Sequence, residues 1–89
     1  MLIKDLQDCG KIIAGDKTIL REVLHPKNDK LQINYSLAHA IVKPGQTSLT
    51  HKLKSSEVYY ILEGEGIMYI KDESEKVHFG QAVYIPPNA

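Results

Sequence analysis

The sequence contains no tryptophan, a single phenylalanine and a single cysteine. With Cys9 alone, no disulfide can form inside the chain, and a lone thiol is typical of a reducing cytoplasm. No local motif places a base beside Cys9, so we interpret it as a small residue near a terminus and not as a nucleophile. The 89 residues make at most one small domain, and a chain of this size has a thin core.

Neither sign of charge is in excess, because 11 basic residues balance 11 acidic ones. No basic stripe runs along the chain, so binding to nucleic acid is not supported. The apolar runs are far shorter than a membrane span, and residues 1–5 lack the charged-then-apolar order of a signal peptide. These absences predict a soluble, cytoplasmic, neutral domain that contacts neither nucleic acid nor membrane.

From Leu31 onward the chain alternates β-favouring runs with turn residues, which predicts β structure. The predicted strands are 31–42, 50–53, 57–62, 67–71, 76–78 and 82–85. Turn residues such as Pro44-Gly45 separate them, and Asp72 to Glu75 are expected to form a polar turn. Pro86 cannot continue a central strand, so the last one ends there. Short strands at regular spacing predict a sandwich or a barrel.

The first thirty residues show a mixed pattern of secondary-structure signals. Residues 18–24 fit a strand or a helix, because Asp16 is suited to cap a helix. Such a helix would carry an apolar stripe made of Ile19, Leu20, Val23 and Leu24. Whichever element forms, the His25-Pro26 pair ends it.

The most informative stretch runs from Gly45 to Gly64 with the spacing Gly-x5-His-x-Leu-x3-Glu-x6-Gly. Side chains alternate along strands, so His51, Leu53, Glu57 and Tyr59 would lie at inward positions of two paired strands. A histidine and a carboxylate that converge inside a small barrel can hold a divalent metal. Three or four protein ligands are usual for such a site, however, and this stretch offers two.

This spacing resembles the first motif of the cupin superfamily, and the chain is similar to sugar-phosphate-isomerase-like cupins. Leu53 stands where that motif has its second histidine. Gly80 and Pro86 match the second cupin motif, with Asn88 in place of its second glycine. The sequence stops at Ala89, before the position of a third histidine.

The resemblance implies an all-β, cupin-like double-stranded β-helix (jelly-roll) barrel over residues 31–89, truncated after the second motif. Residues 1–30 would form an N-terminal extension with an edge strand, so a strand is favoured over a helix at 18–24. A barrel without its closing strands has open edges. We therefore expect a fragment or a partner that completes the fold, and we favour the fragment.

Two functions of different class follow. The first is a small-molecule-binding cupin that holds a small polar or sugar-like ligand in a pocket lined by His51, Leu53, Glu57 and Tyr59. The second is a metal-dependent cupin enzyme, an isomerase or oxygenase, in which His51 and Glu57 hold Mn, Fe, Ni or Zn. Leu53 removes a nitrogen donor and favours the first. No catalytic residue is assigned.

Residues 35–42 alternate two sets of side chains, and the sequence does not determine which set faces the barrel. The larger set is Tyr35, Leu37, His39 and Ile41, and the smaller set lies between them. A chain this short cannot cover the outward set, and exposed apolar area of that kind marks protein interfaces. We therefore predict a homodimer through the first sheet, to which residues 1–24 could add a strand.

Overall fold

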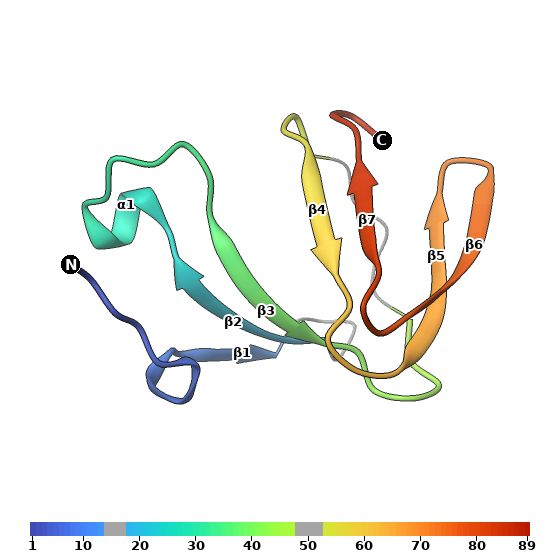
Figure 1. Cartoon of the computed structure of the whole chain (residues 1–89), viewed down its shortest axis with the longest axis horizontal. Coiled ribbons are helices and arrows are strands. Elements are labelled where there is room, and N and C mark those ends of the chain that lie inside the picture. The colour runs from blue at the N-terminus through green and yellow to red at the C-terminus, as the bar shows by residue number, and fades with distance from the viewer. Residues whose placement is uncertain (14–17, 48–52) are drawn as a thin grey trace. The chain divides into compact units, whose positions relative to one another are not determined.

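A computed structural model of the chain describes residues 1–13, 18–47 and 53–89. The chain divides into two compact units, an N-terminal unit, Met1–Leu49, and a C-terminal unit, Thr50–Ala89. Strands dominate the described residues (Figure 1), whose helical elements are the single turns η1, Leu6–Asp8, and α1, Pro26–Asp29. Neither of these helices is long and apolar enough to cross a membrane. The all-β class predicted from the sequence is confirmed.

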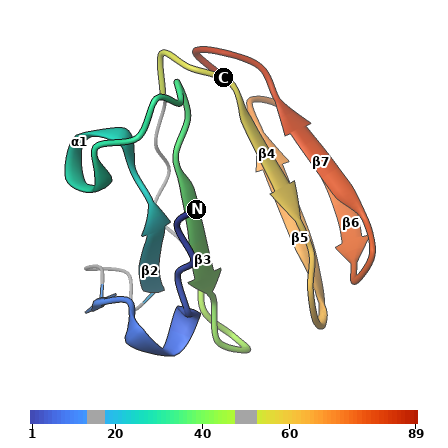
Figure 2. The same cartoon turned by 60° about the vertical axis from the view of Figure 1, so that its left-hand side comes forward.

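The N-terminal unit is built on one antiparallel sheet in the order β1-β2-β3. Its strands are β1, Lys11–Ile13, β2, Ile19–Leu24, and β3, Leu37–Ile41. The strand favoured at 18–24 is therefore confirmed, and β2 and β3 lie side by side (Figure 2). The predicted boundary after residue 30 stays a prediction, and the two strands on either side of it share this sheet.

The strand predicted at 31–42 is too long at its start, because residues 31–36 belong to no strand. Leu24, the last residue of β2, pairs with Leu37, and Pro26 then begins α1. Residues before Leu37 therefore have no neighbouring strand on that side to supply backbone hydrogen bonds. Lys30, in the left-handed region at φ 52, ends α1 and reverses the chain.

Polar contacts hold the N-terminal segment against β2 and α1. The Asp29 carboxylate accepts hydrogen bonds from Lys4 Nζ at 2.8 Å and from the His25 N–H at 3.0 Å. Arg21 Nη1 donates to the Leu6 carbonyl at 2.8 Å. These bonds connect the middle of β2, through Arg21, and α1, through Asp29, to the first eight residues of the chain.

The C-terminal unit contains two antiparallel two-stranded sheets, β4–β7 and β5–β6. Their strands are β4, Glu57–Tyr60, β5, Glu65–Ile70, β6, Glu73–His78, and β7, Ala82–Ile85. The strand predicted at 82–85 matches β7 residue for residue, whereas β6 begins inside the predicted polar turn. The turn is tighter than predicted because Lys71, at φ 53, allows a two-residue hairpin between Ile70 and Glu73.

Backbone hydrogen bonds join the β4–β5 connection to the β6–β7 turn. The Gly80 N–H donates to the Ile61 carbonyl at 2.8 Å, and the Ile61 N–H donates to Gln81 at 2.9 Å. Gly64 and Gly80 have φ angles of 81° and 86°, which a side chain would strain. These two glycines, picked out by the motif spacing, therefore allow the bends where the two sheets meet.

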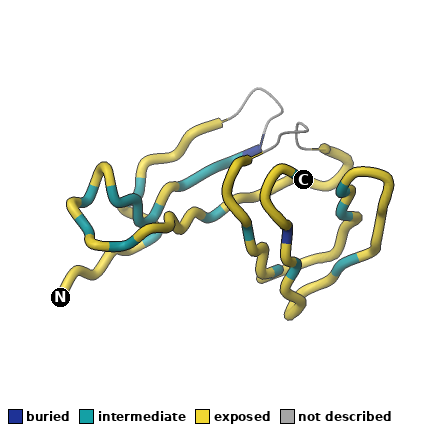
Figure 3. Tube along the Cα trace, turned by 90° about the horizontal axis from the view of Figure 1, so that it is seen from above, coloured by how far each residue is buried: buried dark blue, intermediate teal, exposed yellow. Residues whose placement is uncertain are grey.

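Each sheet of the C-terminal unit has one more buried face (Figure 3). In the β4–β7 sheet, Ile85 is 8% exposed, whereas Val58 and Tyr84 on the opposite face are 67% and 63% exposed. In the β5–β6 sheet, Met68 and Val77 are likewise half-buried. Because side chains alternate along a strand, these residues also determine which face each remaining strand residue lies on. We call this the inner face: Glu57, Tyr59, Val83 and Ile85 on one sheet, and Gly66, Met68, Ile70, Glu73, Glu75 and Val77 on the other.

Candidate functional site

Glu57 and Tyr59 lie together on the inner face of β4, as the period-two pattern predicted. Across the sheet, Glu57 pairs with Ile85 and Tyr59 pairs with Val83. Tyr59 is 37% exposed and Glu57 is half-buried. A carboxylate and a phenol thus stand beside two aliphatic side chains on one small sheet.

The surroundings of Tyr59 raise the pKa of its phenol. Burial is the larger cause, and the negative charge of Glu57 adds to it. Both effects disfavour the phenolate, so Tyr59 is a neutral hydroxyl at physiological pH and can donate a hydrogen bond. The neighbouring carboxylate can accept one. The pair therefore presents a donor and an acceptor to the same small volume.

The other two predicted site residues precede β4. His51 lies outside the described residues. Leu53 is 42% exposed and belongs to no strand, although residues 50–53 were predicted to form one. Its carbonyl accepts a hydrogen bond from the Asn88 N–H at 2.7 Å. That bond lies at the end of the β4–β7 sheet where Glu57 pairs with Ile85, so Leu53 is positioned near the Glu57 end of the site.

The described residues by themselves do not fit a metal. Within residues 1–13, 18–47 and 53–89, no group of three or more His, Cys, Asp and Glu side chains could hold an ion. Glu57 is the described member of the predicted pair, and three or four ligands are usual. The set of His51 and Glu57 stays a prediction, and we derive no chemical step through a metal.

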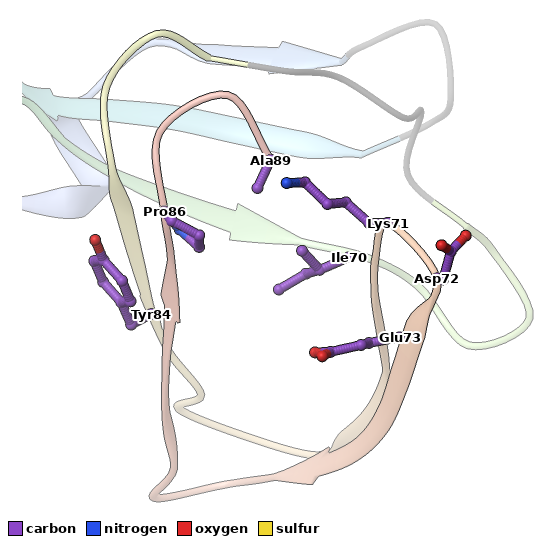
Figure 4. Close-up of a pocket in the computed structure, with 7 residues that line it drawn as sticks. All are labelled: Ile70, Lys71, Asp72, Glu73, Tyr84, Pro86 and Ala89. Atoms are coloured by element: carbon purple, nitrogen blue, oxygen red, sulfur yellow. The ribbon is translucent and has the colours of Figure 1, made fainter.

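A depression of about 370 Å³ lies in the C-terminal unit between the β5–β6 turn and the segment after β7 (Figure 4). Its lining residues are Ile70, Lys71, Asp72, Glu73, Tyr84, Pro86 and Ala89. Sequence reasoning missed this depression. Local patterns identify the hairpin and the Pro86-Pro87 stop separately, and no local signal shows that they lie together.

Comparison with known proteins identifies the family of this chain. No solved structure matches the chain. An uncharacterized protein of Methanocaldococcus jannaschii is 47% identical over 76 residues, a match that covers 84% of this chain. The chain spans about 60% of the length of that relative.

Residues 38–89 match the cupin domain family, a match that includes β3 after its first residue, the site residues of β4 and the whole of β5, β6 and β7. The resemblance read from the spacing of Gly45, Glu57, Gly64 and Gly80 is confirmed. The predicted fold class, an all-β cupin-type jelly roll, is also confirmed. The family match, over more than half of the chain, and the strand-rich units agree, and the chain belongs to the cupin family.

Proposed function

We propose that this small cupin binds a small polar or sugar-like ligand on the inner face of its C-terminal unit. The observation that carries the proposal is the pair of Glu57, which is half-buried, and Tyr59, which is 37% exposed, beside Val83 and Ile85 on one face of the sheet. A ligand hydroxyl can donate to the Glu57 carboxylate while a second oxygen accepts from the Tyr59 phenol. The aliphatic side chains suit the carbon skeleton between those groups.

Two features make this pair suited to binding. Both side chains come from one strand of a paired sheet, and sites on regular elements hold their geometry better than sites on loops. Partial burial also strengthens hydrogen bonds at the pair relative to bonds made in water. Leu53, where the family motif has a histidine, adds an apolar group near the Glu57 end and supplies no further donor.

The test is an NMR titration of the labelled full-length protein with neutral sugars, sugar phosphates and amino acids. It is read on the Tyr59 ring signals of the parent protein and on the methyl signals of Val83 and Ile85 in the parent and both variants. Removing one hydrogen bond by Tyr59→Phe should weaken binding about fivefold to tenfold. Tyr60→Phe is the matched control, because Tyr60 lies on the opposite face of the same strand and is 61% exposed. Equal weakening by both variants, or no shift of Tyr59 with any compound, contradicts the proposal.

The alternative is a metal-dependent isomerase or oxygenase that uses His51 and Glu57 as ligands. The half-buried carboxylate of Glu57, at the position of the family motif, keeps this alternative open. Metal analysis of the purified full-length protein distinguishes the two. Stoichiometric Mn, Fe, Ni or Zn that is lost in His51→Ala would favour the enzyme, and substoichiometric metal unchanged by that variant would favour simple binding.

We also propose that the protein acts in the cytoplasm. The support is chemical: Cys9 is the sole cysteine, so no intrachain disulfide stabilises this small chain. Fractionation of the source cells with an antibody to the protein tests the location. Recovery in the membrane or secreted fraction would contradict it.

A further inference from the structure

Three charged residues line the depression described above, namely Lys71, Asp72 and Glu73. In Figure 4 the Asp72 carboxylate extends away from Ile70 and Pro86, which leaves one ammonium group and one carboxylate beside the hollow. Lys71 occupies the β5–β6 turn, and Glu73, the first residue of β6, pairs with Ile70. In Figure 4 the Lys71 side chain extends toward Ala89, while Glu73 and Ile70 extend toward the segment that holds Pro86. An ammonium group and a carboxylate therefore flank one hollow whose other walls include aliphatic carbon.

Within the part of the chain that the structure describes, neither the Lys71 ammonium group nor the Glu73 carboxylate is paired. Among the described residues the ion pairs are Lys4–Asp29 and Glu22–His25, and no hydrogen bond engages Lys71 or Glu73. Charges at a hairpin tip usually face water and serve solubility. Lys71 and Glu73 are exposed, and they line, together with Ile70 and Pro86, a hollow of about 370 Å³, a volume within the usual range for small-molecule pockets.

The depression and the Glu57–Tyr59 pair lie in the same unit, although Tyr84, one of the residues that line the depression, is on the opposite face of the β4–β7 sheet from Glu57 and Tyr59. Glu57 pairs with Ile85, and Pro86, which lines the depression, is the next residue of the chain. Both features therefore lie at the same end of the β4–β7 sheet. A ligand seated in the depression would have its polar groups near Lys71 and Glu73.

We propose that the depression recognises a small zwitterion. Lys71 pairs with the carboxylate of the ligand, Glu73 pairs with its ammonium group, and Ile70 and Pro86 contact the aliphatic body between them. This inference goes beyond the proposed function, because the residues that line the depression do not include Glu57 or Tyr59. An open site gives each ion pair only modest strength, so selectivity comes from making both contacts at once.

The probes are δ-aminovalerate, β-alanine and L-valine, each compared with the carboxylate and the amine that lack its second charge. Binding to the labelled full-length protein is read on the methyl signals of Ile70 and Ala89. At least one zwitterion should bind about fivefold more tightly than either of its singly charged analogues. If none of the three exceeds its analogues, the inference is wrong.

Charge-neutral variants test the two contacts. Lys71→Gln and Glu73→Gln should each reduce the affinity for the preferred zwitterion to that of a singly charged analogue. Lys76→Gln and Glu65→Gln are the controls, because both positions lie on the opposite face of the β5–β6 sheet. Amide spectra that match the parent protein show that each variant folds.

The outcomes separate this inference from the proposed function. If neutral sugars shift Tyr59 while no zwitterion is preferred, the proposed function stands and the inference fails. If no compound shifts Tyr59, Ile70 or Ala89, both fail. If the Lys76 and Glu65 variants weaken the zwitterion as much as the Lys71 and Glu73 variants, the effect is one of overall charge and the inference is overturned.

Discussion

Ile85→Ala tests whether the inner face is the core of the C-terminal unit. Ile85 is 8% exposed, and it pairs across the sheet with Glu57. Its neighbour in sequence, Tyr84, is 63% exposed, so burial changes sharply between adjacent positions of β7. Truncating Ile85 should therefore cost much more stability than truncating an apolar residue on the other face.

The magnitude follows from the exposed fractions. Ile→Ala removes three carbon groups worth about 0.8 kcal/mol each when buried, so at 8% exposure the loss is about 2 kcal/mol. A cavity that does not collapse raises this toward about 3 kcal/mol. Val58→Ala, the matched control on the opposite face, removes two groups from a side chain that is 67% exposed, so it should cost about 0.5 kcal/mol.

Urea unfolding at constant pH measures both variants. Tyrosine fluorescence is a suitable probe, because four of the five tyrosines belong to the C-terminal unit. Amide intensities of β4 and β7 provide a second probe that identifies the unit that unfolds. A loss of about 2 kcal/mol changes the unfolding equilibrium about 30-fold. If Val58→Ala destabilises the unit as much as Ile85→Ala, the assignment of the inner face is wrong.

Three further predictions concern charge and assembly. Glu57→Gln should lower the pKa of Tyr59 while leaving it above the ordinary value, because burial, the larger cause, remains; an unchanged Tyr59 ring titration by NMR would refute this. The pKa of Asp29 is lowered, first by the hydrogen bond from Lys4 and then by the hydrogen bond from the His25 N–H. The ionised Asp29 carboxylate therefore stabilises the folded chain above the ordinary carboxyl pKa, and this stabilisation is lost as the pH falls through the lowered pKa. Lys4→Met should flatten that acid dependence in unfolding experiments at several pH values, and an unaltered pH profile would count against the pair. Finally, we predict a homodimer through the first sheet, where Leu37 is 54% exposed; a monomer in sedimentation equilibrium at micromolar concentration would exclude it.

The local sequence predicted the ends of strands correctly where a residue that cannot continue a strand follows them. Pro86 cannot continue β7, so the predicted end of that strand was correct. Residues 18–24 carry both a strand and a helix pattern, and β2 forms because β1 and β3 supply hydrogen bonds on its two sides. The start of β3 was placed too early for the same reason, since residues 31–36 favour β structure but have no strand to pair with. Strand propensity alone did not decide either boundary, because pairing is a long-range property.

For the candidate site as well, local spacing predicted some features, whereas others depend on long-range strand pairing. The alternation of side chains placed Glu57 and Tyr59 on one face, and this needed only their spacing. Their partners Ile85 and Val83 depend on the register between β4 and β7, which no local pattern specifies. The raised pKa of Tyr59 follows from that burial and from Glu57, so it could not be predicted from the motif.

The motif position of Leu53 does not by itself assign the chemistry of the site. A leucine in place of a histidine was interpreted as the loss of a metal ligand. In the structure, Leu53 lies outside the strands, and a protonated phenol shares the inner face of β4 with the Glu57 carboxylate. In the proposed site a hydrogen-bond donor and a carboxylate therefore lie on the same face of one strand. Recognition there depends on hydrogen bonds and charges matched to the ligand, which is why the Tyr59, Lys71 and Glu73 variants test function more directly than the motif does.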